Sequence, residues 1–161
     1  MIHLLIRRIL LPFIIAFSVT AQAENGALTK EETKAAFAEV LASHKGKIVY
    51  LDFWASWCSP CRRSFPWLNS LTKQYNKDDF VVLSVNVDND RTFAEEFLQE
   101  TPADFDIFYD PKGVIAKQYK IKGMPSSYII DREGKILSAH VGFSEKKQHL
   151  YTQAFNALLK E

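Results

Sequence analysis

The sequence predicts an α/β fold, a small mixed β-sheet with helices on both faces. Apolar runs with the length of strands alternate along the chain with stretches in which apolar residues recur at helical spacing. Two strand-like runs, 48–53 and 80–87, are almost continuously apolar, which is typical of central strands covered on both faces. The chain has 161 residues, of which 47% are hydrophobic, so it is long enough for one globular domain with a substantial core.

The amino-terminal segment has the composition of a targeting signal. Two arginines precede an apolar run, 9–19, that is short for a membrane span and ends in the small-residue pattern Ala21-Gln22-Ala23. We therefore expect residues 1–23 to be a cleaved secretory signal peptide and residues 24–161 to form a single domain. An uncleaved anchor is the alternative, because Pro12 makes the segment atypical. No cysteine near the expected cleavage site indicates a lipid anchor.

A capping box predicts the first helix. Thr29 is followed three residues later by a glutamate and then by an apolar stripe, so we expect a helix over 30–43. The strand 48–53 comes next and leads through a turn into a helix over about 59–75. Pro66 should kink this helix, because its ring excludes a normal hydrogen bond one turn back.

The second half of the chain alternates in the same way. After the strand 80–87 we expect a helix over 92–99, a strand over 107–109, a helix over 114–119, strands over 126–130 and 136–141, and a last helix that Ser144 caps and that runs to about Leu159. The side chains expected to face the core from the first and last of these helices are Phe93, Phe97, Leu98, Leu150, Phe155, Leu158 and Leu159.

The only two cysteines stand three residues apart in Cys58-Ser59-Pro60-Cys61. They close a loop too small to stabilise a fold, which favours a chemical role. Cysteine attacks as a thiolate, and a helix amino terminus stabilises that anion through free N–H groups and its dipole. Cys58 directly precedes the expected helix, so we predict that it is the nucleophile and that Cys61, one turn on and more enclosed, is the resolving thiol. The pair predicts thiol–disulfide exchange outside the cytoplasm.

Metal binding is the alternative use of such a pair. A structural zinc site needs about four ligands, and apart from the cysteines the expected domain offers only His44, His140 and His149. There is no second pair with ligand spacing, so we predict no metal and no cofactor; a copper chaperone is the most plausible form of this alternative. The formal net charge of +1, with the charges scattered, argues against a nucleic-acid partner.

Asp52 is an acid inside a strand that is otherwise apolar. Burial of a carboxylate without a partner is costly, so the pKa of Asp52 should be raised. Asp52 is thus a candidate proton acceptor for Cys61, directly or through a water. The alternative is a carboxylate at a strand end that is solvated or caps a neighbouring group.

Three further residues are candidates for substrate binding. Met124 and Pro125 enter the strand 126–130, and a cis bond before Pro125 would present backbone polar groups towards the dithiol; a trans turn proline is the alternative. Trp57 should lie at the edge of the active site and limit solvent access, whereas Trp54 and Trp67 are expected in the core. Two arginines follow Cys61 and could favour the thiolate or a partner's acids, or simply form a solvated helix face.

The segment 52–61, which reads DFWASWCSPC, resembles the active-site segment of the thioredoxin family. The segment 87–123, with an added helix and strand, resembles the exported TlpA/ResA-like branch of that family. Three prolines and glycines match family positions: Pro66 the helix kink, Pro125 the cis-proline loop, and Gly142 the glycine after the last strand. The resemblance covers residues 30–159.

This resemblance implies a thioredoxin fold with a TlpA-like inserted helix and strand, a cis peptide before Pro125, and Asp52 as a buried acid. It also implies a periplasmic disulfide reductase that acts on disulfide-containing proteins and is kept reduced by a membrane protein of the DsbD/CcdA type; we expect a monomer. A disulfide oxidase or isomerase, a copper-binding module and a redox-inactive interaction module are the alternatives. A peroxidase is disfavoured, because no threonine-containing peroxidatic loop precedes Cys58.

The sequence departs from the family at three positions. Ser64 stands where several branch members carry a glutamate, so the acid role falls to Asp52. Pro125-Ser126-Ser127 replaces the Pro-Glu-Thr typical of cytochrome c maturation proteins, which weakens apocytochrome as the substrate. Ser84 corresponds to the lysine that thioredoxin places near its buried acid, so the charge environment of Asp52 differs.

Overall fold

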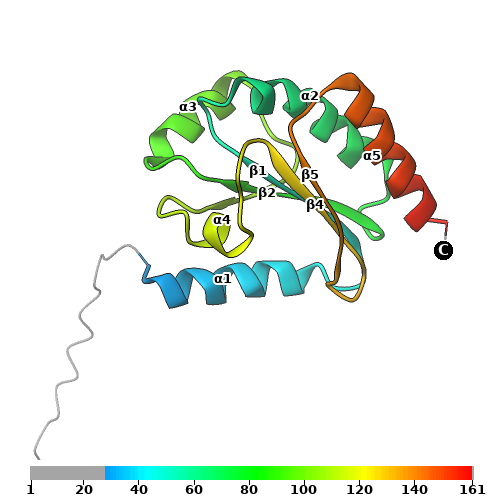
Figure 1. Cartoon of the computed structure of the whole chain (residues 1–161), viewed down its shortest axis with the longest axis horizontal. Coiled ribbons are helices and arrows are strands. Elements are labelled where there is room, and N and C mark those ends of the chain that lie inside the picture. The colour runs from blue at the N-terminus through cyan, green and yellow to red at the C-terminus, as the bar shows by residue number, and fades with distance from the viewer. Residues whose placement is uncertain (1–27, 161) are drawn as a thin grey trace, which may run out of the picture.

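The computed structural model describes residues 28–160 and confirms the predicted α/β architecture. A five-stranded sheet with strand order β3-β2-β1-β4-β5 forms the centre, and helices cover both faces (Figure 1). The elements in chain order are α1 Lys30–Ser43, β1 Ile48–Trp54, α2 Ser59–Gln74, β2 Phe80–Asn86, α3 Arg91–Glu100, β3 Asp106–Tyr109, α4 Val114–Gln118, β4 Ser126–Ile130, β5 Ile136–Val141 and α5 Glu145–Leu158.

The expected signal peptide, residues 1–23, lies outside the described residues. In the part of the chain that is described, none of the helices has the length and apolar character needed to cross a bilayer.

The sheet is mixed, with β1 at its centre. β1 pairs in parallel with β2, and β2 in parallel with β3, whereas β4 runs antiparallel to both β1 and β5. Helices α2, α3 and α5 lie on one side of the sheet, and α1 and α4 on the other (Figure 1). The expected inserted helix and strand are α3 and β3. Parallel pairing brings the carboxyl ends of β1 and β2 to the same edge, where the chain turns into α2.

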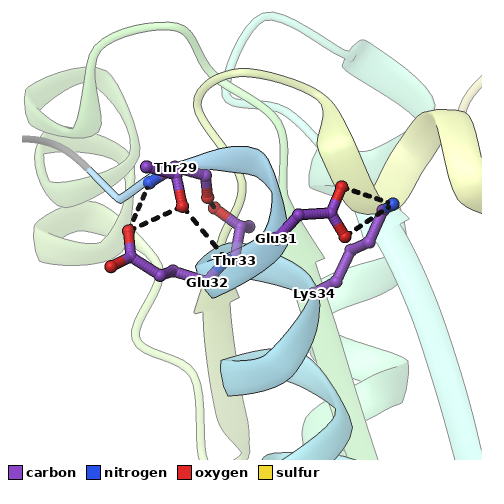
Figure 2. Close-up of polar contacts among 5 residues, drawn as sticks. All are labelled: Thr29, Glu31, Glu32, Thr33 and Lys34. Atoms are coloured by element: carbon purple, nitrogen blue, oxygen red, sulfur yellow. Dashed lines mark hydrogen bonds and ion pairs between the residues drawn. The ribbon is translucent and has the colours of Figure 1, made fainter.

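The capping box that predicts α1 is present (Figure 2). The Glu32 backbone N–H donates to Thr29 Oγ1 at 3.3 Å, and Glu32 Oε2 accepts from the Thr29 backbone N–H at 2.8 Å. These bonds satisfy two backbone N–H groups that the helix end would otherwise leave free. Two hydrogen bonds from Thr29 hold the pKa of Glu32 below its usual range. The bond from the Thr29 hydroxyl has the larger effect, and the bond from its backbone N–H adds to it.

The two faces of β1 belong to two separate parts of the core. All seven residues of the strand are buried, as expected for a central strand. Tyr50 and Trp54 pack in the cluster beneath α2, α3 and α5, whereas Leu51 and Phe53 pack in the cluster on the side of α1 and α4. Trp54 is fully buried and Trp67 nearly so, which confirms both as core residues.

Two of the expected core positions are wrong. Phe93 is 49% exposed, and Leu150 is 55% exposed. The residues buried from α3 are Ala94 and Phe97, and those from α5 are Tyr151 and Phe155. Neighbouring residues of a helix point about 100° apart, and here the face that buries Ala94 and Tyr151 leaves Phe93 and Leu150 towards solvent. The other expected residues, Leu98, Phe155, Leu158 and Leu159, do pack in or against the core.

Candidate active site

The dithiol lies where β1 turns into α2. The turn is closed by a hydrogen bond from the Cys58 backbone N–H to the Ala55 carbonyl oxygen at 3.0 Å. Cys58 is the N-cap residue of α2, and Pro60 occupies the first turn, as expected of proline at a helix start. Cys58 and Cys61 form a disulfide with their Cα atoms 5.2 Å apart, and Cys58 Sγ accepts a hydrogen bond from the Cys61 backbone N–H at 3.3 Å. The sulfur of Cys58 therefore meets the field of the helix amino terminus.

The two sulfurs differ in their access to solvent. Cys58 is 5% exposed and borders an open cavity of about 600 Å³, whereas Cys61 has no exposed surface and does not line the cavity. The cavity lies between the dithiol turn, the end of β2, α4 and the loop before β4, and its lining residues are Trp57, Cys58, Ser59, Pro60, Val87, Ala116, Ile121, Lys122, Gly123 and Met124. A partner that enters the cavity meets Cys58 first.

Asp52 is buried on the face of β1 that α2 covers, between Tyr50 and Trp54. Its register partners are Ser84 on β2 and Ser127 on β4. Asp52 Oδ2 has no hydrogen-bond partner, and burial raises the pKa of the carboxyl well above its usual value. The alternative of a solvated or capping carboxylate does not fit this position.

Besides burial, a negative charge on Asp52 would raise the pKa of two tyrosines on the same side of the sheet. Burial is the main cause that raises the pKa of both Tyr50 and Tyr151, and the negative charge of Asp52 adds to it. Within residues 28–160, no basic side chain lowers the pKa of Asp52. The acid therefore sits in an uncompensated apolar environment, in which the neutral, protonated form is favoured.

The loop before β4 approaches the dithiol from the other side. The Met124–Pro125 peptide bond is cis, which is the isomer that the resemblance implies. Met124 lines the same cavity as Trp57 and Cys58, and Trp57 is 69% exposed at its edge. Pro125 is buried behind them, and its carbonyl oxygen accepts a hydrogen bond from the Gly142 backbone N–H at 2.7 Å. The structure thus brings Trp57 and Met124 to the dithiol, with Pro125 beneath them.

One buried acid at this site was missed by the sequence reasoning. Asp88 follows β2, and its carboxylate accepts from the Ser56 backbone N–H at 2.9 Å, from the Ser56 hydroxyl at 3.0 Å and from Asn86 Nδ2 at 2.7 Å. Ser56 lies inside the turn that carries Cys58. An acid at the end of an apolar strand is visible in the sequence, but only the parallel pairing of β1 with β2 brings Asp88 to Ser56.

The two arginines after Cys61 lie on the exposed face of α2. Arg62 forms an ion pair with Glu100 at 3.1 Å and stacks over Phe97, and Arg63 donates to Ser59 Oγ at 3.1 Å. These contacts fit the solvated-face alternative. Across residues 28–160, no three His, Cys, Asp or Glu side chains gather in a way that could hold a metal ion.

Comparison with known proteins agrees with this geometry. Residues 21–158 match the Redoxin family. The chain is 34% identical over 113 residues to the thiol-disulfide oxidoreductase ResA of Geobacillus thermodenitrificans, an alignment that covers 68% of this chain and 65% of the relative. The chain thus spans slightly less than two thirds of that protein's length.

Solved structures show the same fold. The chain is 46% identical to a Chlorobium tepidum protein named as the thiol:disulfide interchange protein DsbE, with a TM-score of 0.72 and coverage of 74% of this chain and 84% of that one. It is 34% identical to the exposed lipoprotein thioredoxin Etrx1 of Streptococcus pneumoniae, with a TM-score of 0.62 and coverage of 71% and 88%. The chain therefore belongs to the Redoxin family and has the thioredoxin-like fold that its active-site segment led us to expect.

Proposed function

We propose that the protein is a thiol–disulfide oxidoreductase that reduces protein disulfides through Cys58 and Cys61. The observation that carries this proposal is the unequal placement of the two sulfurs. Cys58 borders the open cavity at a helix amino terminus, and Cys61 is completely enclosed. The names of the relatives, a thiol-disulfide oxidoreductase and a thiol:disulfide interchange protein, support the same chemistry.

The reaction runs in two exchanges. The Cys58 thiolate attacks one sulfur of a substrate disulfide, forms a mixed disulfide and releases the other substrate sulfur as a thiolate. Cys61 then loses its proton to Asp52, directly or through a water, and attacks Cys58 Sγ. The second substrate thiolate leaves, and the Cys58–Cys61 disulfide remains, which is the oxidised form seen in the structure. Two electrons pass from the dithiol to the substrate.

The cavity around Cys58 is the proposed docking site for the substrate. Its walls are largely apolar, and Lys122 is the single charged residue among those that line it. Trp57 supplies a large exposed aromatic surface, the kind of side chain that often anchors a protein partner. We assign substrate binding to Trp57, Met124 and Pro125, the last acting through the loop that it shapes.

The direction of electron flow and the location of the protein extend this proposal. We assign a reducing role in the periplasm, a monomeric state, a cleaved signal peptide at 1–23, and renewal of the dithiol by a membrane protein of the DsbD/CcdA type. The sequence resemblance to the TlpA/ResA-like branch supports the reducing role. Similarity to a streptococcal protein named as an exposed lipoprotein supports a site of action outside the cytoplasm.

A disulfide isomerase is the second candidate. A Bacteroides thetaiotaomicron protein that is 30% identical, with a TM-score of 0.66, is named as a protein disulfide isomerase. An isomerase rearranges wrong disulfides in a substrate without net reduction. Refolding of scrambled ribonuclease without added reductant, together with weak insulin reduction, would favour this candidate.

The proposal is tested by insulin reduction and by trapping. Wild-type protein should reduce insulin with dithiothreitol as the electron source, and Cys58→Ala should abolish both reduction and mixed-disulfide formation. Cys61→Ala should keep the first exchange and accumulate mixed disulfides in cells, which mass spectrometry would identify. If Cys58→Ala traps partners and Cys61→Ala does not, the two roles are reversed. Mass analysis of the exported protein checks whether it begins near Glu24.

A further inference from the structure

We infer that Asp88 is a positioning residue for Cys58 and that its buried negative charge makes the Cys58–Cys61 pair a stronger reductant. This inference rests on the proposed function and assigns to one residue a part in the direction of electron flow. A hydrogen-bond network joins the end of β2 to the turn before α2.

The hydrogen bonds of Asp88 hold the turn between β1 and α2 in place. Asp88 Oδ2 accepts from the Ser56 backbone N–H at 2.9 Å and from Asn86 Nδ2 at 2.7 Å, and Oδ1 accepts from the Ser56 hydroxyl at 3.0 Å. The Asp88 backbone N–H in turn donates to Asn86 Oδ1 at 3.2 Å. The carboxylate of Asp88 is the acceptor in all three of its hydrogen bonds. Ser56 is held at two atoms, and the turn closes two residues later on Cys58.

The carboxylate contacts the residue that stands two positions before the reacting cysteine. Successive Cα atoms are about 3.8 Å apart, so a carboxylate oxygen 2.9 Å from the Ser56 nitrogen lies within roughly 14 Å of the Cys58 sulfur. Asp88 is 2% exposed, and water and salt screen a buried charge far less than an exposed one. The reactive form of the reduced pair carries a thiolate at Cys58, and the disulfide carries no charge. A nearby negative charge therefore disfavours the reduced form and promotes the release of its electrons.

The other charged side chains around the turn should have a smaller effect on the equilibrium between the dithiol and the disulfide. Arg62 and Arg63 face solvent, and Arg62 is already paired with Glu100. Lys122 is exposed on the far wall of the cavity. Asp52 is buried, but it lies on the strand face beneath α2, and burial favours its neutral form.

Asp88→Asn separates charge from geometry. Its carbonyl oxygen accepts from Ser56 N–H and from Asn86 Nδ2, as Asp88 Oδ2 does, and its amide donates to the Ser56 hydroxyl, which reverses one bond only. Ser56→Ala is the converse variant, because it removes one bond and keeps the charge. Asp79→Asn removes an exposed acid just before β2, at the opposite end of that strand from Asp88, and serves as the matched control.

The test equilibrates each full-length variant with reduced and oxidised glutathione and measures the fraction of Cys58–Cys61 disulfide by thiol alkylation. In this equilibrium the dithiol and oxidised glutathione exchange two electrons to give the disulfide and two reduced glutathiones. We expect Asp88→Asn to shift the equilibrium constant about three- to tenfold towards the dithiol, and Asp79→Asn and Ser56→Ala to shift it by less than about twofold.

Several outcomes would overturn the inference. An equilibrium constant of Asp88→Asn equal to that of the wild type would show that the charge has no effect. A shift in Ser56→Ala as large as that in Asp88→Asn would assign the effect to the hydrogen bonds alone. Asp88→Ser, smaller and neutral, repeats the test if Asp88→Asn folds poorly by circular dichroism. A wild-type protein that exchanges with glutathione but never reduces insulin would count against the proposed function instead.

Discussion

Asp52→Asn is the substitution that should separate folding from catalysis in this protein. The side chain is buried, Oδ2 accepts no hydrogen bond, and burial raises the pKa of the carboxyl well above its usual value. Asparagine has nearly the same shape and cannot carry the negative charge. We therefore expect the disulfide form of Asp52→Asn to have a higher free energy of unfolding than the wild type at neutral pH. We also expect the variant to be slower in catalysis.

The stability gain follows from the burial of an unpartnered group. At neutral pH, folding requires Asp52 either to bury its charge or to take up a proton, and asparagine requires neither, so the substitution should add about 1–3 kcal/mol near neutral pH. That corresponds to a rise in Tm of about 3 °C for each kcal/mol in a domain of this size. The gain arises because unfolding lets the wild-type Asp52 ionise in water, which favours the unfolded state. Asparagine has no such ionisation.

The pH dependence has a defined sign. The pKa of Asp52 is raised in the folded protein, so the folded state binds this proton more tightly than the unfolded chain does. The stability that Asp52 contributes is then fully present below its unfolded pKa of about 4 and is lost as the pH rises towards the folded pKa. The advantage of Asp52→Asn should be small near pH 4 and should grow towards neutrality.

The catalytic loss should fall on the resolving step. General base catalysis typically contributes about 10²–10⁴-fold, and a buried acceptor with a raised pKa is well matched to a thiol near neutral pH. Stopped-flow fluorescence with a preformed mixed disulfide on Cys58 measures that step alone. We expect a slowing of at least about tenfold near pH 7 that shrinks at higher pH, where Cys61 ionises without help.

Three results would refute this reasoning. A Tm at pH 7 at or below that of the wild type would contradict the uncompensated burial of Asp52. An advantage that does not change between pH 4 and 7 would contradict the raised pKa. An unchanged resolving rate would remove Asp52 from the mechanism even if both stability results hold. Asp79→Asn, an exposed acid outside the site, controls for the loss of one negative charge.

Trp57→Ala should raise KM for insulin several-fold with a smaller effect on kcat, because it removes exposed aromatic surface at the cavity and leaves the dithiol in place; equal losses in both constants would contradict a docking role. Phe155→Ala should lower the free energy of unfolding in urea by about 3–5 kcal/mol, whereas Leu150→Ala, on the exposed face of the same helix, should lower it by less than about 0.5 kcal/mol. Thr29→Ala should cost about 1 kcal/mol through the lost capping box, and a change near zero would mean that α1 frays without consequence.

Structural features that depend on nearby residues could be predicted from the sequence. The bounds of α1, β4 and β5 are those predicted, because caps, turns and short apolar runs lie within a few residues of the elements they define. The orientation of α3 and α5 was only partly predictable. Phe93 lies beside a buried alanine and Leu150 beside a buried tyrosine, and the choice between neighbours depends on packing against elements distant in sequence.

The residues of the candidate site also fall into those that local sequence predicts and those that depend on contacts distant in sequence. The dithiol and Asp52 were predictable because spacing and an acid within an apolar run are visible in a few residues. The cavity wall formed by Ala116 and Ile121 was missed, because it comes from a helix and loop more than 50 residues after Cys58. Asp88 was missed for a related reason. It meets Ser56 across a separation of 32 residues, through the parallel register that pairs Trp54 with Asn86.

The two buried acids of the site show why residue type alone does not assign a role. Asp88 accepts hydrogen bonds at both carboxylate oxygens, whereas Asp52 Oδ2 accepts none. A carboxylate that is hydrogen-bonded at both oxygens to the turn suits a role in holding that turn. A carboxylate oxygen that accepts no hydrogen bond loses none by protonation, which suits proton transfer with Cys61. We therefore expect the two substitutions to asparagine to differ in kind. Asp88→Asn should move the equilibrium with glutathione, and Asp52→Asn should chiefly slow the approach to it.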